Sequence, residues 1–347
     1  MVRLLFLFLL IPLAAFLGFA YQAIGSFFDR RRMRSFGSWI EIGSRRFFIS
    51  KSGPAGPSIV FECGLAASSQ NWSFFQDALA SEARTLSYDR AGMGFSTPSS
   101  SPRTPAALAG ELHALLVHAR IEPPWVLVGH SYGALILRRF AADHPRDVVG
   151  LVLIDPMRVD EWSRWSDARR RIFEGSIHLM RRLALFAHFG IARFVAHHLM
   201  KHSGRISPHF SRLIGDDARR LLERTTSELQ KMPSAVWPAV IAHWSGPDFY
   251  RGVAAQLRSL PASLKEMEQV PPLQKMPVIV LIPAASVRLT KDSLAHIAPQ
   301  AEQWSVERCG HWVHLDRPDV VLQAIRSILD RSHTRHRARV VTMQARG

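Results

Sequence analysis

One serine stands in a spacing that suits nucleophilic chemistry. Ser131 lies at the centre of segment 129–133, which reads Gly-His-Ser-Tyr-Gly and directly follows the apolar run Val126–Val128. In this G-x-S-x-G pattern, the serine occupies a sharp turn between a buried strand and a helix. The glycines leave room where a Cβ would clash, and the start of the helix would stabilise a developing oxyanion. The pattern therefore predicts that Ser131 is a nucleophile for acyl transfer.

A nucleophilic serine needs a neighbouring base, and we predict that His311 supplies it. The chain contains 16 histidines, most of which we expect to have structural roles. His311 differs from these because it follows Gly310 in a predicted loop between a strand and the last helix. We interpret His314 and His130, which lie close to the predicted base and nucleophile, as packing residues.

A third group must orient the base, and Asp155 is our candidate for this acid. It is the first residue after the apolar strand predicted at 148–154, and catalytic residues of parallel sheets gather beyond the carboxyl ends of strands. The strand predicted at 278–282 is followed by no carboxylate before Asp292, which we interpret as a helix N-terminal residue. The alternative is that Asp155 only shapes the turn before Pro156.

Strands and helices alternate on both sides of these residues, which predicts a doubly wound, mostly parallel α/β sheet covered on both faces. The predicted strands are 39–42, 46–50, 58–61, 84–88, the run before Ser131, 148–154, 278–282 and 303–306. The predicted helices are 104–119, a helix from about 132 to 142, 291–298 and 318–329. The alternation stops over 157–272, where apolar residues recur at helical spacing and no strand pattern is found.

We divide the chain into five segments. They are an N-terminal membrane anchor with a basic flank (1–35), the first part of the core (36–156), a helical insertion (157–272), the second part of the core (273–330) and a basic tail expected to be unstructured (331–347).

The core resembles the α/β-hydrolase superfamily over about residues 39–330, and the insertion resembles the helical cap of that superfamily. Segment 129–133 matches the nucleophile elbow. Segment 88–96 is similar to the family's D-R-x-G-x-G-x-S turn. Residues 63–65 (Cys-Gly-Leu) stand where many members have His-Gly before an oxyanion-hole residue, and 309–311 (Cys-Gly-His) match the placement of the catalytic histidine.

The resemblance implies a serine hydrolase of the carboxylic-ester-hydrolase type, acting through an acyl-serine intermediate without metal or cofactor. The backbone N–H groups of Leu65 and Tyr132 would form the oxyanion hole. Members usually carry the acid after the strand that precedes the histidine strand, where this chain has Ser286; Asp155 is in the position that some members use.

C–C bond hydrolysis and acyl transfer stay open as alternatives. So does an inactive binding or scaffold protein, because the acid is missing near Ser286. The aromatic and aliphatic insertion favours an apolar acyl or aromatic substrate.

Two further features concern partners. The formal net charge of +16 favours anionic partners, and because the chain has no nucleic-acid-binding motif we expect a membrane rather than nucleic acid.

The uncharged stretch 4–28 would form a helix about 37 Å long, enough to cross a bilayer. The arginines at 30–34 favour a catalytic domain on the cytoplasmic side. A cleaved signal peptide is the alternative. Segment 178–201 has the composition of either an amphipathic membrane-surface helix or a solvated basic face.

The chain has only two cysteines, Cys63 and Cys309, which excludes a disulfide scaffold. Each precedes a predicted active-site loop. The two side chains form either a bridge between these loops or two small buried apolar groups.

Overall fold

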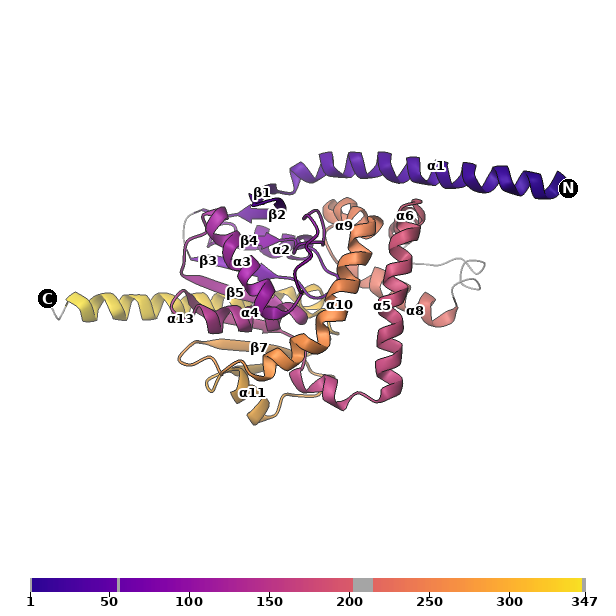
Figure 1. Cartoon of the computed structure of the whole chain (residues 1–347). Helices are drawn as coiled ribbons and strands as arrows, with labels where there is room; N and C mark the ends of the chain where they lie inside the picture. The colour runs from indigo at the N-terminus through magenta and orange to yellow at the C-terminus, as the bar shows by residue number, and fades with distance from the viewer. Residues whose placement is uncertain (1, 55–56, 202–214, 345–347) are drawn as a thin grey trace.

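An eight-stranded sheet forms the centre of the computed structural model, which describes residues 2–54, 57–201 and 215–344 (Figure 1). The strands are β1 (Ser38–Ile42), β2 (Arg45–Ser52), β3 (Ser58–Glu62), β4 (Arg84–Tyr88), β5 (Trp125–His130), β6 (Val148–Ile154), β7 (Val278–Pro283) and β8 (Glu302–Val306). Their order is β1-β2-β4-β3-β5-β6-β7-β8. The pairs β1–β2 and β2–β4 are antiparallel and the others parallel, which confirms the predicted mostly parallel sheet.

The sheet is buried on both faces, and this explains its strand sequences. In β5, Leu127 packs into one apolar layer, whereas Val126 and Val128 pack into the other, because successive side chains of a strand point to opposite faces. The first layer contains α3 (Pro105–Ala119), α4 (Tyr132–Asp143) and α11 (Lys291–Ile297). The second contains α2 (Ser73–Ala78), α12 (Val313–Asp316) and α13 (Pro318–Gln344).

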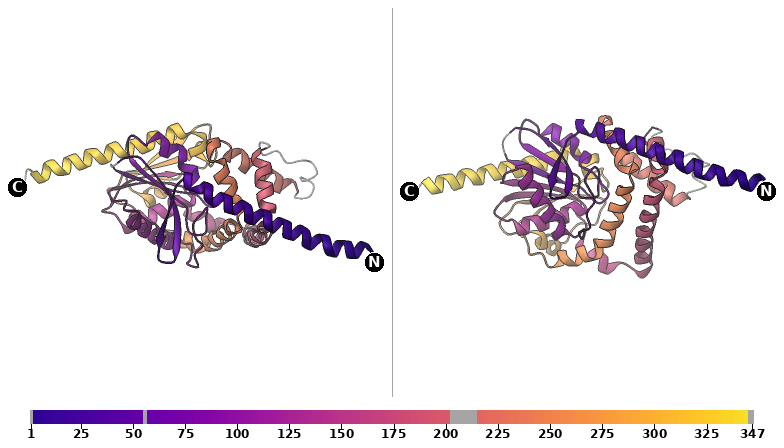
Figure 2. Two further views of the ribbon diagram at one scale, coloured as in Figure 1. Left: turned by 90° about the horizontal axis from the view of Figure 1, so that it is seen from above. Right: turned by 45° about the horizontal axis from the view of Figure 1, so that its top comes forward.

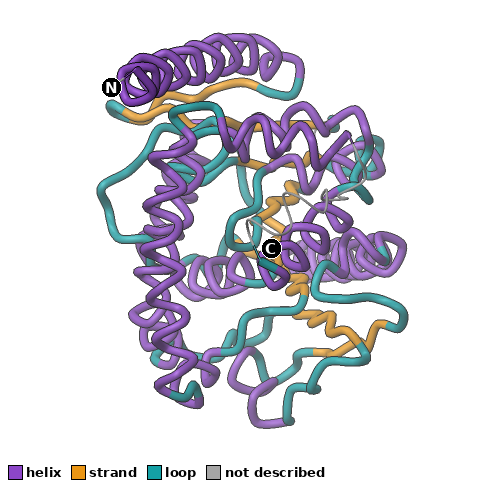
Figure 3. The backbone as a smooth tube through the Cα atoms, turned by 90° about the vertical axis from the view of Figure 1, so that its right-hand side faces the viewer, coloured by secondary structure: helices purple, strands orange, loops and turns teal. Residues whose placement is uncertain are grey.

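The described residues of 157–272 form helices only and lie beyond the carboxyl ends of the parallel strands. They are the 3₁₀ segments η3 (Val159–Arg164) and η4 (Ser234–Val236), and the helices α5 (Asp167–Ala187), α6 (Ile191–Lys201), α8 (Asp216–Leu229), α9 (Trp237–Ser245) and α10 (Pro247–Glu268). We call this region the cap. The long helices α5 and α10 lie side by side, and Figure 3 shows the cap helices in front of the sheet.

The N-terminal helix α1 (Val2–Arg32) and the C-terminal helix α13 project at opposite ends of the molecule (Figures 1 and 2). A short 3₁₀ turn, η1 (Met33–Ser35), joins α1 to the sheet. Among the described residues, one helical stretch, Leu10–Ser35, is apolar and long enough to cross a membrane, a test that a signal sequence would also pass. The bent pair α5 and α6 passes the same test if the two helices are taken as one span.

The C-terminal helix is longer than predicted. We expected a helix over 318–329 and an unstructured tail over 331–347, but α13 continues to Gln344, so the prediction for the tail is wrong as far as that residue. Residues 345–347 lie outside the described residues. The segment 319–346 contains no glycine or proline to end the helix, and many of its residues have good helix propensity.

Candidate active site

Ser131 occupies the strained turn between β5 and α4. Its backbone has φ 52° and ψ −115°, a conformation that L-residues rarely adopt. The turn is fixed by a hydrogen bond from the Ser131 N–H to the Ile154 carbonyl oxygen (2.9 Å). A Cβ at Gly133 would clash with the Cys63 carbonyl oxygen, so the close approach of the neighbouring strand requires glycine there.

The structure brings His311 and Asp155 together. His311 lies in the loop between β8 and α12, and Asp155 is the first residue after β6. His311 Nδ1 donates to Asp155 Oδ2 over 2.7 Å. An ionised carboxylate only accepts hydrogen bonds, so this contact leaves His311 Nε2 as the basic nitrogen. The Asp155 N–H donates to the Leu281 carbonyl oxygen (2.8 Å), which fixes the acid beside the end of β7. Asp292, the other carboxylate considered, lies in the first turn of α11.

The loop that carries the base is held against the nucleophile elbow. His130 Nε2 donates to the His311 carbonyl oxygen (2.9 Å), and the two rings have centroids 4.6 Å apart. Among the described residues no hydrogen bond joins Ser131 Oγ to His311, whose side chain is 43% exposed. Catalytic hydrogen bonds often tighten only when substrate is bound.

The other histidines near the elbow are buried and electrically neutral. Burial lowers the pKa of His130 well below its ordinary value, and the proximity of His314 and His311 adds to this. Burial also lowers the pKa of His314 to about 3, and its ring stacks on Trp72 with centroids 4.9 Å apart. Neither ring therefore carries charge near neutral pH; His314 makes packing contacts, whereas His130 also donates the hydrogen bond to the His311 carbonyl oxygen.

The loop after β3, which contains Leu65, lies beside the nucleophile. A Cβ added at Gly64 would lie 3.5 Å from Ser131 Cβ and 2.7 Å from His130 Nδ1, so the two segments touch. The second predicted oxyanion donor, Tyr132, is the first residue of α4. The two predicted donors thus follow neighbouring parallel strands, Leu65 after β3 and Tyr132 after β5.

A buried arginine holds the loop after β3, which we call the oxyanion loop because it carries the predicted oxyanion donor Leu65. Arg90, only 2% exposed, donates to the carbonyl oxygens of Cys63 and Gly64 (2.6 Å each). In a trans peptide the C=O and the next N–H point in opposite directions, so this contact turns the Leu65 N–H away from Arg90. Arg90 also forms an ion pair with Glu62 (2.5 Å), which is fully buried at the end of β3.

Two residues of the cap, Gln256 and His243, bind the loops after β3 and β4. Gln256 of α10 accepts a hydrogen bond from Arg90 (2.9 Å). His243 of α9 accepts from the Gly94 N–H at Nδ1 (2.9 Å), which leaves Nε2 to donate to the Ala66 carbonyl oxygen (3.2 Å). Burial lowers the pKa of His243 to about 4. Sequence reasoning identified neither residue, and it placed Arg90 only within the family-like turn 88–96. The one available signal was Glu62, a carboxylate ending an otherwise apolar strand.

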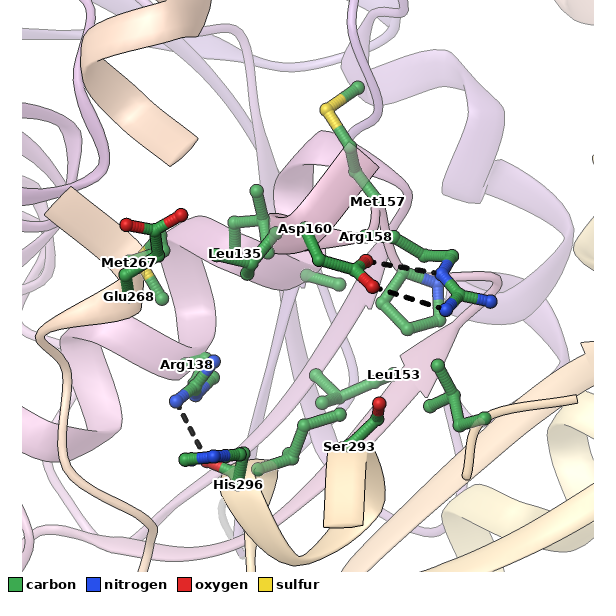
Figure 4. Close-up of a pocket in the computed structure, with 15 residues that line it drawn as sticks. Leu135, Arg138, Leu153, Met157, Arg158, Asp160, Met267, Glu268, Ser293 and His296 are labelled. Carbon is green, nitrogen blue, oxygen red and sulfur yellow. Dashed lines mark hydrogen bonds and ion pairs between the residues drawn. The ribbon is translucent and has the colours of Figure 1, made fainter. Parts of the chain in front are cut away.

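A cavity of about 320 Å³ lies behind the elbow, between α4, the start of the cap and α11 (Figure 4). Met157 lines it, and the Met157 N–H donates to the Ser131 carbonyl oxygen (3.3 Å), so the cavity is next to the nucleophile's backbone. Its walls are largely apolar, with an Arg158–Asp160 ion pair on one side. The lining residues are Ala134, Leu135, Arg138, Leu153, Pro156, Met157, Arg158, Val159, Asp160, Met267, Glu268, Leu289, Ser293, His296 and Ile297.

Both cysteines are free thiols, so the alternative of a bridge between them is wrong. Cys63 is buried and its Sγ lies 3.0 Å from the Ser68 carbonyl oxygen, whereas Cys309 contacts the Val306 carbonyl oxygen. In the part of the chain that the structure describes, no group of three or more His, Cys, Asp or Glu side chains is arranged to hold a metal ion.

Comparison with known proteins identifies the family. A family model described as the alpha/beta hydrolase fold matches residues 57–318. An uncharacterised protein, YqjL, from Bacillus subtilis is 36% identical over 134 residues, which cover 36% of this chain and 53% of YqjL. An AB hydrolase superfamily protein from Gibberella zeae is 38% identical over 120 residues, covering 32% and 37% of the two chains.

The alignments thus span about half or less of the length of these curated relatives. A solved structure from Pseudomonas aeruginosa, of a protein provisionally named an epoxide hydrolase, is similar with a TM-score of 0.63 and 18% identity. That match covers 86% of this chain and 96% of the other, and at this identity it shows a shared fold. Because the family model matches most of the core and the cap, the chain belongs to the α/β-hydrolase family.

Proposed function

We propose that this α/β-hydrolase is a serine hydrolase that cleaves an ester or related acyl compound through an acyl-serine intermediate. The observation that carries the proposal is the 2.7 Å hydrogen bond between His311 Nδ1 and Asp155 Oδ2 on a loop bound to the nucleophile elbow. It supports a base whose Nε2 is free to accept a proton, and an acid able to stabilise the imidazolium that forms.

The proposed reaction has two halves. In the first, Ser131 Oγ attacks the carbonyl carbon while His311 Nε2 takes the hydroxyl proton, and the N–H groups of Leu65 and Tyr132 hold the oxyanion. Protonated His311 then gives this proton to the leaving oxygen as the C–O bond breaks. In the second half, water loses a proton to His311 and attacks the acyl-serine; protonated His311 then returns this proton to Ser131 Oγ as the acyl–oxygen bond breaks, which releases the acid and restores Ser131.

The residue at the elbow separates this proposal from epoxide hydrolysis. In epoxide hydrolases and dehalogenases of this fold an aspartate attacks the substrate, and this chain has Ser131 at that place. C–C bond hydrolysis and acyl transfer would use the same three side chains, so product analysis must distinguish them. The paired Asp155 and His311 favour an enzyme over an inactive scaffold.

An apolar acyl or aromatic group is the proposed substrate portion. The cavity beside Met157 supports this, because aliphatic side chains such as Leu135, Leu153 and Leu289 line it. It adjoins the backbone of Ser131, and none of the three proposed catalytic side chains is among its lining residues. A volume of about 320 Å³ is at the lower end of the range for small-molecule sites.

The helix α1 is the proposed membrane anchor, with the catalytic domain on the cytoplasmic side. Its uncharged stretch 4–28 and the arginines at its end, Arg30 to Arg32, support both statements. Extraction with alkaline carbonate should leave the full chain in the membrane fraction, and release of the full-length chain would exclude the anchor. A reporter fused to the C-terminus that is active only outside the cytoplasm would exclude the orientation.

Labelling with a fluorophosphonate tests the catalytic proposal without knowledge of the substrate. We expect one adduct, on Ser131, located by mass spectrometry of the full chain. Ser131→Ala should abolish labelling, and His311→Ala should slow it by several orders of magnitude. Ser286→Ala and His118→Ala, at exposed positions, should label at the wild-type rate. A folded protein that is unlabelled, or labelled at another serine, would refute the proposal.

A further inference from the structure

Exposed large apolar side chains are concentrated in two parts of the molecule. Among the described residues outside α1 and the cap, only Phe74, Val117 and Val287 are of this kind. In the cap they all belong to α5, α6 and the turn between them: Ile172, Leu179, Leu185, Phe186, Phe189, Ile191 and Phe194. Scattered single apolar residues are normal on a protein surface, whereas exposed apolar side chains that gather in one region mark sites of interaction.

Most of these side chains gather where α5 meets α6. The two helices are bent by 96° across a short turn, and the turn and the adjoining helix ends carry Leu185, Phe186, Phe189, Ile191 and Phe194. Phe186 and Phe194 are 54% and 65% exposed. We call these five residues the apolar corner.

The apolar corner is continuous with α1. A Cβ at Gly18 would lie 2.5 Å from the Phe189 carbonyl oxygen, so the two backbones are in contact. A Cβ added at Gly190 would lie 2.6 Å from the Tyr21 ring, so these two residues are also in contact. The helix α1 runs across the cap in all three ribbon views, beside α9 and the end of α6 (Figures 1 and 2).

Polar contacts fix α1 in this position. Arg193 of α6 is 3% exposed and forms an ion pair with Asp29 (2.7 Å). It also donates to Gln22 (3.0 Å) and Ser26 (3.3 Å), and Gln22 donates to the Ser245 carbonyl oxygen (3.0 Å). The partners on α1 are spaced by four and three residues, so they share one face of that helix.

The opposite face of the same helical segment is apolar and uncovered. Ile24, Phe27 and Phe28 are 46–59% exposed, close in sequence to the polar residues that bind the cap. The second half of α1 therefore lies with one face on protein and the other uncovered. It is not a helix surrounded by lipid on every side, as the simple spanning anchor predicted from sequence would be.

Basic side chains border the apolar corner. Arg181 and Arg182 are exposed one turn before Leu185, with His178 exposed on the preceding turn. At the other end of the surface, Arg30 to Arg32 end α1. Apolar side chains beside arginines are the pattern of helices that lie at the level of lipid headgroups, where anionic lipids attract the cations.

We propose that the apolar corner and the exposed face of α1 form one surface that binds a lipid bilayer, so that the cap itself is seated in the headgroup layer. This rests on the proposed anchor α1. It differs from the simple tether because it fixes one orientation of the catalytic domain and makes α5 and α6 part of the membrane-binding surface. It favours the membrane-surface interpretation of segment 178–201 over the solvated one.

Accessibility of single cysteines tests this surface in the full chain. In a Cys309→Ser background, where Cys63 is buried, we would introduce Phe186→Cys or Phe194→Cys as test sites. Val117→Cys and Val287→Cys are the controls, because these side chains are 58% and 78% exposed on other elements of the same domain. Each protein is reconstituted at low density in vesicles of phosphatidylcholine with about one-fifth phosphatidylglycerol and treated with a membrane-impermeant maleimide.

We expect the two test sites to react at least tenfold more slowly than the two controls, and to react a few-fold faster when phosphatidylglycerol is omitted. Equal rates at all four sites would overturn the proposal. Protection that grows with protein density at fixed lipid would overturn it in favour of a second copy of the chain. Release of the chain by carbonate would remove the anchor as well, whereas loss of fluorophosphonate labelling on the same vesicles would affect only the catalytic proposal.

Discussion

Replacing Asp155 by Asn would test the proposed catalytic arrangement most directly. This change removes the negative charge of the side chain, and Asn tolerates the same backbone conformation. Asp155 has φ 38°, a conformation that Asn and Asp tolerate better than other residues with a Cβ. Asp155→Asn therefore keeps the turn after β6 and the backbone hydrogen bond to Leu281. Asp155→Ala would mix the chemical effect with backbone strain.

The expected loss follows from the contact with His311. In the native protein a carboxylate oxygen 2.7 Å from Nδ1 keeps the proton on that nitrogen. An amide at the same place can present its NH₂ group instead, which favours the tautomer with the proton on Nε2. That tautomer cannot accept the proton of Ser131. In other triads this exchange lowers turnover by about 10⁴, which corresponds to about 5.5 kcal/mol of transition-state stabilisation.

The rate of fluorophosphonate labelling measures this effect, with the thermal unfolding temperature as a check on folding. Asp292→Asn is the matched control and should label within about twofold of wild type, since Asp292 lies at the start of α11. Combining Asp155→Asn with His311→Ala should be little worse than His311→Ala alone, because the two act as a unit. A loss below tenfold, or a large loss in Asp292→Asn, would show that another group orients His311.

Three further predictions concern stability, measured by urea unfolding of the full chain in detergent. Ser131→Gly and Ser131→Ala should both be inactive, but the glycine variant should be more stable by about 1–2 kcal/mol, because it relieves the positive φ of 52°; equal stability would mean that the turn is unstrained. Arg90→Met should cost about 3–5 kcal/mol by leaving buried Glu62 without a counter-charge, and adding Glu62→Gln should recover much of this loss; a double variant as unstable as the single would contradict the argument. Because the His243 pKa of about 4 is below that of the unfolded chain, near 6.5, only the unfolded state binds the proton between these values. The free energy of unfolding should therefore fall on acidification from pH 6.5 to 4, and His243→Gln should remove up to about 1.4 kcal/mol per pH unit of this slope; an unchanged slope would refute the assignment.

The sheet could be predicted from sequence because each strand is short, apolar and bounded by turn residues. The predicted strand 148–154 and the observed β6 coincide, since Asp155-Pro156 ends the apolar run. The tail after 330 could not be predicted in this way. Whether a helix continues through a polar, basic segment depends on small differences in helix propensity, because the segment has no apolar face to bury. Here α13 continues to Gln344.

The candidate site was predictable only where chemistry dictates residue type and order. A nucleophile, a base and an acid must each be one of few residue types at the end of a strand, so Ser131, His311 and Asp155 could be proposed, and the structure brings His311 and Asp155 into contact. The residues that position the oxyanion loop are different. Gln256 meets Arg90 across 166 positions of sequence, and nothing in its own neighbourhood indicates that contact. Such pairs arise from packing of the cap on the core.

The cap is built in two layers with different contacts. The inner helices α9 and α10 hold the loops of the site, through His243 to Ala66 and through Gln256 to Arg90. Gly252 of α10 packs so closely on Gly92 that any Cβ would clash with its carbonyl oxygen. The principal contacts of the outer helices α5 and α6 are instead with α10, α9 and each other. The side chains of the cap that hold the loops after β3 and β4 therefore come from α9 and α10, through contacts in which α5 and α6 take no part.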